Sequence, residues 1–215
     1  MPTPLVPDLC RLSVGVVLLL PDVLDEFARG RRAGSAPGSA DGSSAESAIR
    51  AIDRATREAL LQCHLFCGFP RTIAALDHLR AAGLPLAEAT DGGAAAGTPE
   101  GGADLFDRIY GDGATDVRAH LRALDPDLEA MVAGHAYGAV LSRGGLDAGA
   151  RELLAVVMLA ATGHDRQLAS HVRGAIRCGV AAADLHAALD AVQDLVGTER
   201  MARARDVAAR FSVAE

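Results

Sequence analysis

The 215-residue chain contains no lysine, no asparagine and no tryptophan, and only 3% of its residues are aromatic. Without lysine it cannot form the Schiff base of lysine-bound pyridoxal enzymes, and it cannot carry a Walker-type phosphate loop, whose lysine reaches the phosphates. Without asparagine it has no acceptor for N-glycosylation. All 21 basic side chains other than histidine are therefore arginines, a bias typical of a GC-rich genome.

The chain also has few cysteines and no long apolar run. Four cysteines in 215 residues are too few for a disulfide framework. The net charge is −7, without a basic stripe, which argues against a nucleic-acid partner. The longest apolar run, Val14 to Leu20, is far shorter than the roughly 18 residues of a membrane span. It ends at Pro21 with no cleavage site of the signal-peptide type, so we expect a cytoplasmic protein that binds no membrane.

The apolar half of the chain predicts helices. Alanine, leucine and valine dominate it, which favours helix over sheet. Apolar residues recur with helical spacing, and no segment alternates convincingly with a period of two. We therefore predict an all-α helical bundle. The expected helices cover 48–67, 73–82, 116–141 with a break at Asp125-Pro126, 147–161, 165–178, 182–196 and 199–211.

Two glycine- and serine-rich stretches, 33–45 and 90–103, divide the chain. We interpret 33–45 as a flexible insertion in a first helical unit that covers 1–89. We interpret 90–103 as a linker to a second unit that covers 104–215.

The two units look like copies of one another. Three segments of the first align in order with the second: Arg11–Val17 with Arg151–Val157, Leu24–Gly30 with Leu168–Gly174, and Leu60 and Gly68 with Leu189 and Gly197. The copies would cover about 8–85 and 147–212, and chance similarity between amphipathic helices is the alternative. The alignment places Leu12 and Phe27 opposite Glu152 and His171, so the first copy lacks the polar groups of the second.

The strongest candidate site surrounds the predicted hairpin at Gly163. Glu152 lies eleven residues before this glycine and His171 eight after it, or roughly 16 and 12 Å along the two helices. Antiparallel helices would bring both side chains to the same level, with His164 near the same face, and Asp165 could cap the second helix. A glutamate beside a histidine forms an acid–base pair that works near neutral pH. The alternative is that Glu152 pairs with an arginine and both histidines are surface or core groups.

Other candidate groups are weaker. Arg143 lies in a glycine-bearing loop and could bind a substrate carboxylate in a bidentate manner, or it could be a solvated loop residue. Cys63 and Cys67 are four residues apart, a spacing that suits neither a helical disulfide nor a zinc site, so we interpret them as packing residues. Ser170 and His171 are adjacent and point about 100° apart, which excludes a Ser-His dyad. The sequence predicts no metal site.

These blocks together resemble the carboxymuconolactone decarboxylase family, which includes the alkylhydroperoxidase D-like proteins. The resemblance rests on Tyr137-Gly138-x-Val140-Leu141-Ser142-Arg143-x-Gly145-Leu146, on Arg151-Glu152-Leu153, on Gln167-Leu168-x-Ser170-His171 with Ala175 and Gly179, and on Cys67-Gly68-Phe69-Pro70-Arg71 with Ala75-Leu76 in the first copy. It implies a helical bundle assembled into trimers or hexamers. The family's peroxidase branch carries Cys-x-x-Cys-x-x-x-His, but its two cysteines are His164 and Gln167 here, so the resemblance disfavours a peroxidase or disulfide reductase.

The resemblance implies a lyase-like enzyme that decarboxylates, or moves a proton on, a small lactone or carboxylic acid without a cofactor. In this interpretation Arg143 holds the carboxylate, Glu152 shuttles the proton, His171 gives electrophilic help and His164 lines the pocket. Two alternatives stay open. One is a non-catalytic binding or assembly protein of the same fold, and the other is a redox protein that uses Cys63, Cys67 or Cys178.

Overall fold

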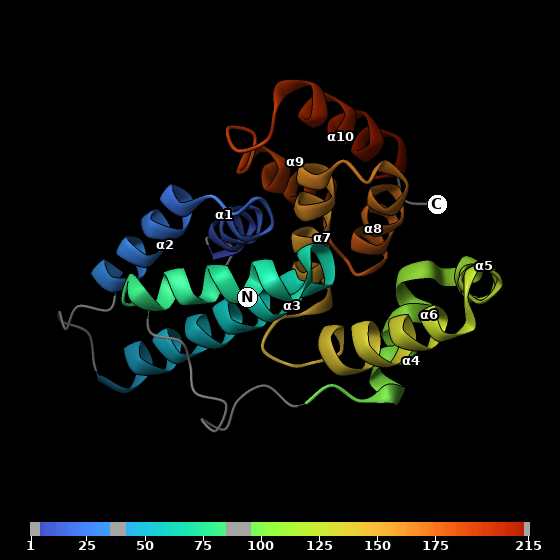
Figure 1. The fold of residues 1–215 in the computed structure, drawn as a ribbon, viewed down its shortest axis with the longest axis horizontal. Coiled ribbons are helices and arrows are strands. Elements are labelled where there is room, and N and C mark those ends of the chain that lie inside the picture. Colours follow the sequence, from blue (N-terminus) through green and yellow to red (C-terminus); the bar gives the residue numbers. More distant parts are fainter. Residues whose placement is uncertain (1–4, 35–41, 85–95, 213–215) are drawn as a thin grey trace.

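A computed structural model describes residues 5–34, 42–84 and 96–212. Every regular element in these residues is a helix and none is a strand, which confirms the all-α prediction (Figure 1). The elements are α1 (Leu5–Leu18), α2 (Pro21–Gly34), α3 (Gly42–Ala81), α4 (Pro99–Tyr110), the 3₁₀ turn η1 (Gly111–Gly113), α5 (Ala114–Leu124), α6 (Pro126–Met131), the π-helix η2 (Val132–Leu141), α7 (Ala148–Thr162), α8 (Asp165–Arg177), α9 (Ala182–Asp190) and α10 (Thr198–Phe211).

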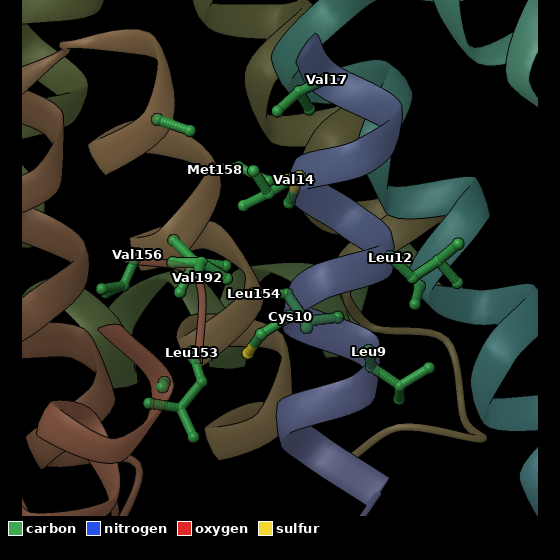
Figure 2. Close-up of a cluster of buried hydrophobic side chains, with 14 of the residues drawn as sticks. Leu9, Cys10, Leu12, Val14, Val17, Leu153, Leu154, Val156, Met158 and Val192 are labelled. Atoms are coloured by element: carbon green, nitrogen blue, oxygen red, sulfur yellow. The ribbon is translucent and has the colours of Figure 1, made fainter. Parts of the chain in front are cut away.

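Helices α1 and α7 form the centre of the molecule. They pack against each other, with α2 and α3 on the α1 side and α8 to α10 on the α7 side (Figure 1). Figure 2 shows Val14 of α1 beside Met158 of α7, and both side chains are fully buried. Burial of such side chains contributes roughly 1.5–3 kcal/mol each. Cys10 is buried in the same cluster, as expected for a packing residue.

Capping residues set the helix ends around the candidate site. Asp125 accepts a hydrogen bond from the Leu128 amide, and Pro126 opens α6, which confirms the predicted break. Helix α7 ends at Gly163, whose φ of 75° lies in the left-handed region, as a C-terminal glycine should. The predicted cap at Asp165 is wrong. His164 occupies the cap position without a side-chain bond to the backbone, and Asp165 already lies in the helix.

Helix α3 contains the two helices that we predicted over 48–67 and 73–82, joined at a sharp kink. It runs from Gly42 to Ala81 and kinks at Gly68, whose φ of 76° and ψ of 166° are not helical. Pro70 follows in the first turn after the kink, where its missing N–H costs nothing. Over Glu46–Ala81 this helix is long and apolar enough to cross a membrane by length and composition alone. That is weak evidence for a span, because α3 also packs against α1, α2 and α7.

The expected linker at 90–103 is shorter than predicted. Thr98 accepts a hydrogen bond from the Gly101 amide at 3.0 Å, and Pro99 follows it. A threonine cap followed by proline starts a helix, so 99–103 belong to α4. Residues 85–95 lie outside the described part of the chain. The same holds for 35–41 of the expected insertion, while 42–45 begin α3.

Candidate active site

Glu152 and His171 meet between α7 and α8. The two helices form the predicted antiparallel hairpin, and His171 Nδ1 lies 2.9 Å from Glu152 Oε2. The Glu152 side chain is 2% exposed and the His171 side chain 13% exposed. A carboxylate only accepts hydrogen bonds, so Nδ1 carries the proton. The ring nitrogen that remains for chemistry is Nε2.

Gly174 makes the close approach of α8 possible. A Cβ built at this position would lie 2.4 Å from Glu152 Oε2 and 2.8 Å from Ile109 Cγ2 of α4. Both distances are far inside van der Waals contact. Any side chain here would therefore displace the Glu152 carboxylate or push α4 away. The Phe66 ring of α3 makes a T-shaped contact with the His171 ring, with 6.2 Å between the two ring centroids.

Two tyrosines, Tyr110 of α4 and Tyr137 of η2, lie close to each other near the site. The hydroxyls of Tyr110 and Tyr137 lie 3.3 Å apart, and both rings contact Phe106. Burial raises the pKa of both phenols, and the charge of Glu152 raises it further. These groups therefore stay protonated near neutral pH. The sequence assigned no role to Tyr110, because α4 begins inside the stretch that we interpreted as a linker.

The pair determines the charge of His171. Burial alone would lower the pKa of this imidazole, but the Glu152 charge and the hydrogen bond to it outweigh burial and raise the pKa above its ordinary value. A protonated imidazole in this position is a competent general acid, and its neutral form is a competent base.

We expect the His171 ring to titrate with a midpoint above pH 6.5, followed by the ring proton signals in NMR spectra. In Glu152→Gln the midpoint should fall, because only the effect of burial remains. The raised pKa stabilises the fold fully below the unfolded value of about 6.5, and this contribution is lost as pH rises through the folded pKa. Glu199→Gln, a change at an exposed residue, serves as control. An unchanged midpoint in Glu152→Gln would contradict the pairing.

The structure does not bring Arg143 to this pair. Its Nε and Nη2 donate to the two carboxylate oxygens of Glu58, both at 2.9 Å. Glu58 also accepts a bond from Arg151 Nη2 at 3.0 Å. Arg151 precedes Glu152 on α7, and successive helical residues point about 100° apart. Arg143 thus lies in a separate buried cluster and binds a carboxylate of the protein itself.

The predicted placement of His164 also differs. It is exposed at the α7–α8 turn, and its Nδ1 lies 2.9 Å from Thr162 Oγ1. Seven helical residues separate it from His171, about 10 Å along the axis, so it does not line the site. The structure therefore brings together Glu152 and His171 but neither of the two predicted substrate-binding residues. The buried Glu58 was missed, although a glutamate inside the apolar spacing of 48–67 is a signal for such a partner.

Two of the candidate redox thiols, Cys63 and Cys178, are poorly suited to redox chemistry. Burial raises the pKa of Cys63 to about 12, and it raises that of Cys178 to about 11, with the charge of Glu152 adding to the effect. A thiol with so high a pKa provides little thiolate near neutral pH. In the described part of the chain no three His, Cys, Asp or Glu side chains gather where a metal ion could be held.

The chain was also compared with known protein families. Residues 126–210 match the model of the carboxymuconolactone decarboxylase family. The match extends from the start of α6 into α10 and includes both Glu152 and His171. The match covers this part of the chain and does not extend to the first helical unit. A search of the curated proteins found no match.

Proposed function

We propose that the carboxymuconolactone decarboxylase family domain at 126–210 moves a proton to or from a carbon atom of a small lactone or carboxylic acid, without a cofactor. One observation carries this proposal, the 2.9 Å contact between His171 Nδ1 and Glu152 Oε2 in a nearly closed site. A buried carboxylate that holds one ring nitrogen leaves the other nitrogen oriented and basic. His171 Nε2 is then the atom that moves the proton.

This assignment reverses the roles expected from the sequence. Glu152 is nearly inaccessible and faces Nδ1, so it acts as a positioning residue that keeps the tautomer and stabilises the imidazolium. His171, whose side chain is 13% exposed, is the member of the pair nearer to solvent. Burial lowers the pKa of His171, but the charge of Glu152 and the hydrogen bond to it raise this pKa above its ordinary value, which favours the imidazolium that donates a proton.

The family name suggests a lactone acid as substrate. When such an acid loses carbon dioxide, the electron pair of the broken C–C bond stays on the substrate, conjugated with the lactone carbonyl. The His171 imidazolium can then donate its Nε2 proton to carbon, and the neutral ring regains a proton from water. Arg143 has no part in this scheme, because Glu58 occupies its guanidinium.

We expect His171→Gln to lower kcat by about 10²–10⁴-fold, the usual contribution of a general acid–base group. Glu152→Gln should lower kcat by about 10–100-fold, as the loss of a supporting partner does, and move the pH profile toward acid. The measurement is carbon dioxide release from 4-carboxymuconolactone and related lactone acids. His186→Gln, at an exposed histidine of α9, serves as control. Full activity of His171→Gln, or no turnover by the native protein, would refute the proposal.

The main alternative, a non-catalytic assembly protein of the same fold, is favoured by an apolar patch on α5 and α6. Leu124, Leu128 and Met131 are 63%, 43% and 66% exposed. Clustered exposed apolar side chains are typical of protein contacts. They also support a homo-oligomer, with the trimer or hexamer of the family as the proposed form. If the native protein turns over no lactone acid, the assembly function becomes the better interpretation.

A further inference from the structure

The two helical units make equivalent contacts through equivalent arginines. Arg11 of α1 donates to the Ala191 carbonyl at 2.8 Å, and Arg151 of α7 donates to the Gln62 side chain at 3.3 Å. Arg11 and Arg151 are paired in the sequence alignment. Gln62 and Ala191 differ by 191 − 62 = 129, the offset that pairs Leu60 with Leu189. The arginine of α1 and the arginine of α7 therefore each contact the aligned position of the opposite unit.

A second pair of arginines repeats the pattern within each unit. Arg71 donates to the Val17 carbonyl, and Arg200 donates to the Ala161 carbonyl. The two arginines again differ by 200 − 71 = 129. Each acceptor is the next-to-last residue of the first helix of its copy, since α1 ends at Leu18 and α7 at Thr162. Independent contacts therefore support the alignment between the two units.

This alignment gives the site pair a counterpart in the first unit. Leu12 and Phe27 stand opposite Glu152 and His171, and Gly30 stands opposite Gly174. In the second unit this place is closed, because α4 packs against Gly174 through Ile109. In the first unit a Cβ built at Gly30 would meet nothing within 4 Å.

A cleft occupies the corresponding place of the first unit. It has a volume of about 460 Å³ and lies between α1, α2 and α3, and we call it the α1–α2–α3 cleft. Leu12, Phe27 and Gly30 all line it. The position that carries the acid–base pair in one unit is therefore an open apolar cleft in the other.

The charged side chains at the cleft are Asp8, Arg11, Glu26 and Arg31. Arg11 binds Asp194 at 2.6 Å, and Arg31 binds Asp53 at 2.5 Å. An anionic ligand would have to break one of these ion pairs, whereas a neutral ligand would not. Asp8 and Glu26 are exposed, so both can stay solvated when a neutral ligand binds. The rest of the wall is mainly apolar, with Leu5, Leu12, Val23, Phe27 and Ile52 beside Gly30. A concave apolar site of this volume suits a small molecule.

From this equivalence we propose that the α1–α2–α3 cleft is a second ligand site, which binds a neutral apolar small molecule. The ligand takes the place that Ile109 of α4 fills beside the site of the second unit. The site has no acid–base pair, because Leu12 and Phe27 replace Glu152 and His171. It binds without converting its ligand, and it does not depend on the proposed function.

The test uses the full chain and N-phenyl-1-naphthylamine, a neutral apolar dye that fluoresces on burial. We expect saturable binding with one dye per chain. Gly30→Leu places a side chain in the open space of the cleft and should weaken binding at least tenfold. Ala33→Leu adds the same side chain to α2 at an exposed position outside the cleft lining, and should bind the dye as the native protein does.

Two further measurements complete the test. Glu152→Gln should bind the dye normally, which separates this site from the proposed active site. Far-ultraviolet circular dichroism checks that Gly30→Leu is folded. Binding that survives in Gly30→Leu, or the absence of saturable binding by the native chain, overturns the proposal. Equal loss in Ala33→Leu would do the same, because the effect would then not belong to the cleft.

Discussion

Glu58→Gln is expected to lower the free energy of unfolding by about 3–5 kcal/mol, as the removal of one partner from a buried ion pair does. The Glu58 side chain is 1% exposed and lies between Arg143 and Arg151. Burial lowers the pKa of Arg151, and the Glu58 carboxylate opposes that effect. A neutral glutamine would leave the buried Arg151 guanidinium, also 1% exposed, without a compensating charge. Urea unfolding measures the loss.

Glu199→Gln is the matched control for this change. Glu199 also binds an arginine, Arg203 at 2.6 Å, but its side chain is 82% exposed. Solvent screens such a pair, and its loss should change stability little. Equal effects of the two substitutions would mean that burial does not determine the role of Glu58. The Glu58 cluster would then not be what holds the Arg143 loop to α3.

Gly174→Ala and Gly30→Ala should change stability in opposite directions. Alanine normally stabilises a helix interior by about 0.5–1 kcal/mol relative to glycine. Gly30→Ala should show this gain, because its Cβ would meet open space. Gly174→Ala should instead lose about 1–3 kcal/mol, the usual effect of overpacking, because its Cβ would overlap Glu152 and Ile109. Thermal unfolding of the two variants measures the difference.

The pKa of His171 provides a second readout for Gly174→Ala. A methyl group that displaces the Glu152 carboxylate weakens the hydrogen bond to His171, so the pKa of the imidazole should fall. Gly30→Ala should leave this pKa unchanged, since α2 is not part of the site. If Gly174→Ala is as stable as the native protein and keeps the His171 titration, then α8 does not need a glycine at this position.

The helix pattern and the acid–base pair were predictable because both depend on short stretches of chain. Asp125-Pro126 and Gly163 are start and stop signals that act within one turn. Once Gly163 closes a hairpin, the rise per residue sets the levels of Glu152 and His171. Their contact bridges only 19 residues, and a two-helix hairpin suffices to bring them together.

The interaction partners and positions of the other polar side chains could not be predicted from the sequence in the same way. Arg143 and Glu58 lie 85 residues apart, and no local rule says which carboxylate a loop arginine meets. The exposed place of His164 follows from the cap position that it takes, where we expected Asp165. Tyr110 reaches the site region only because α4 crosses α8. Each of these outcomes depends on how separate helices pack.

Local chemistry in the chain thus specifies the all-α class, most helix ends and the Glu152–His171 pair, since propensity, capping and helical rise act between near neighbours. Tertiary packing alone decides that Glu152 is buried while His171 is partly exposed, and that Arg143 binds Glu58. It also decides that the first unit has an open cleft where α4 covers the second. Burial and long-range pairing set these features, and both exist only once distant helices meet.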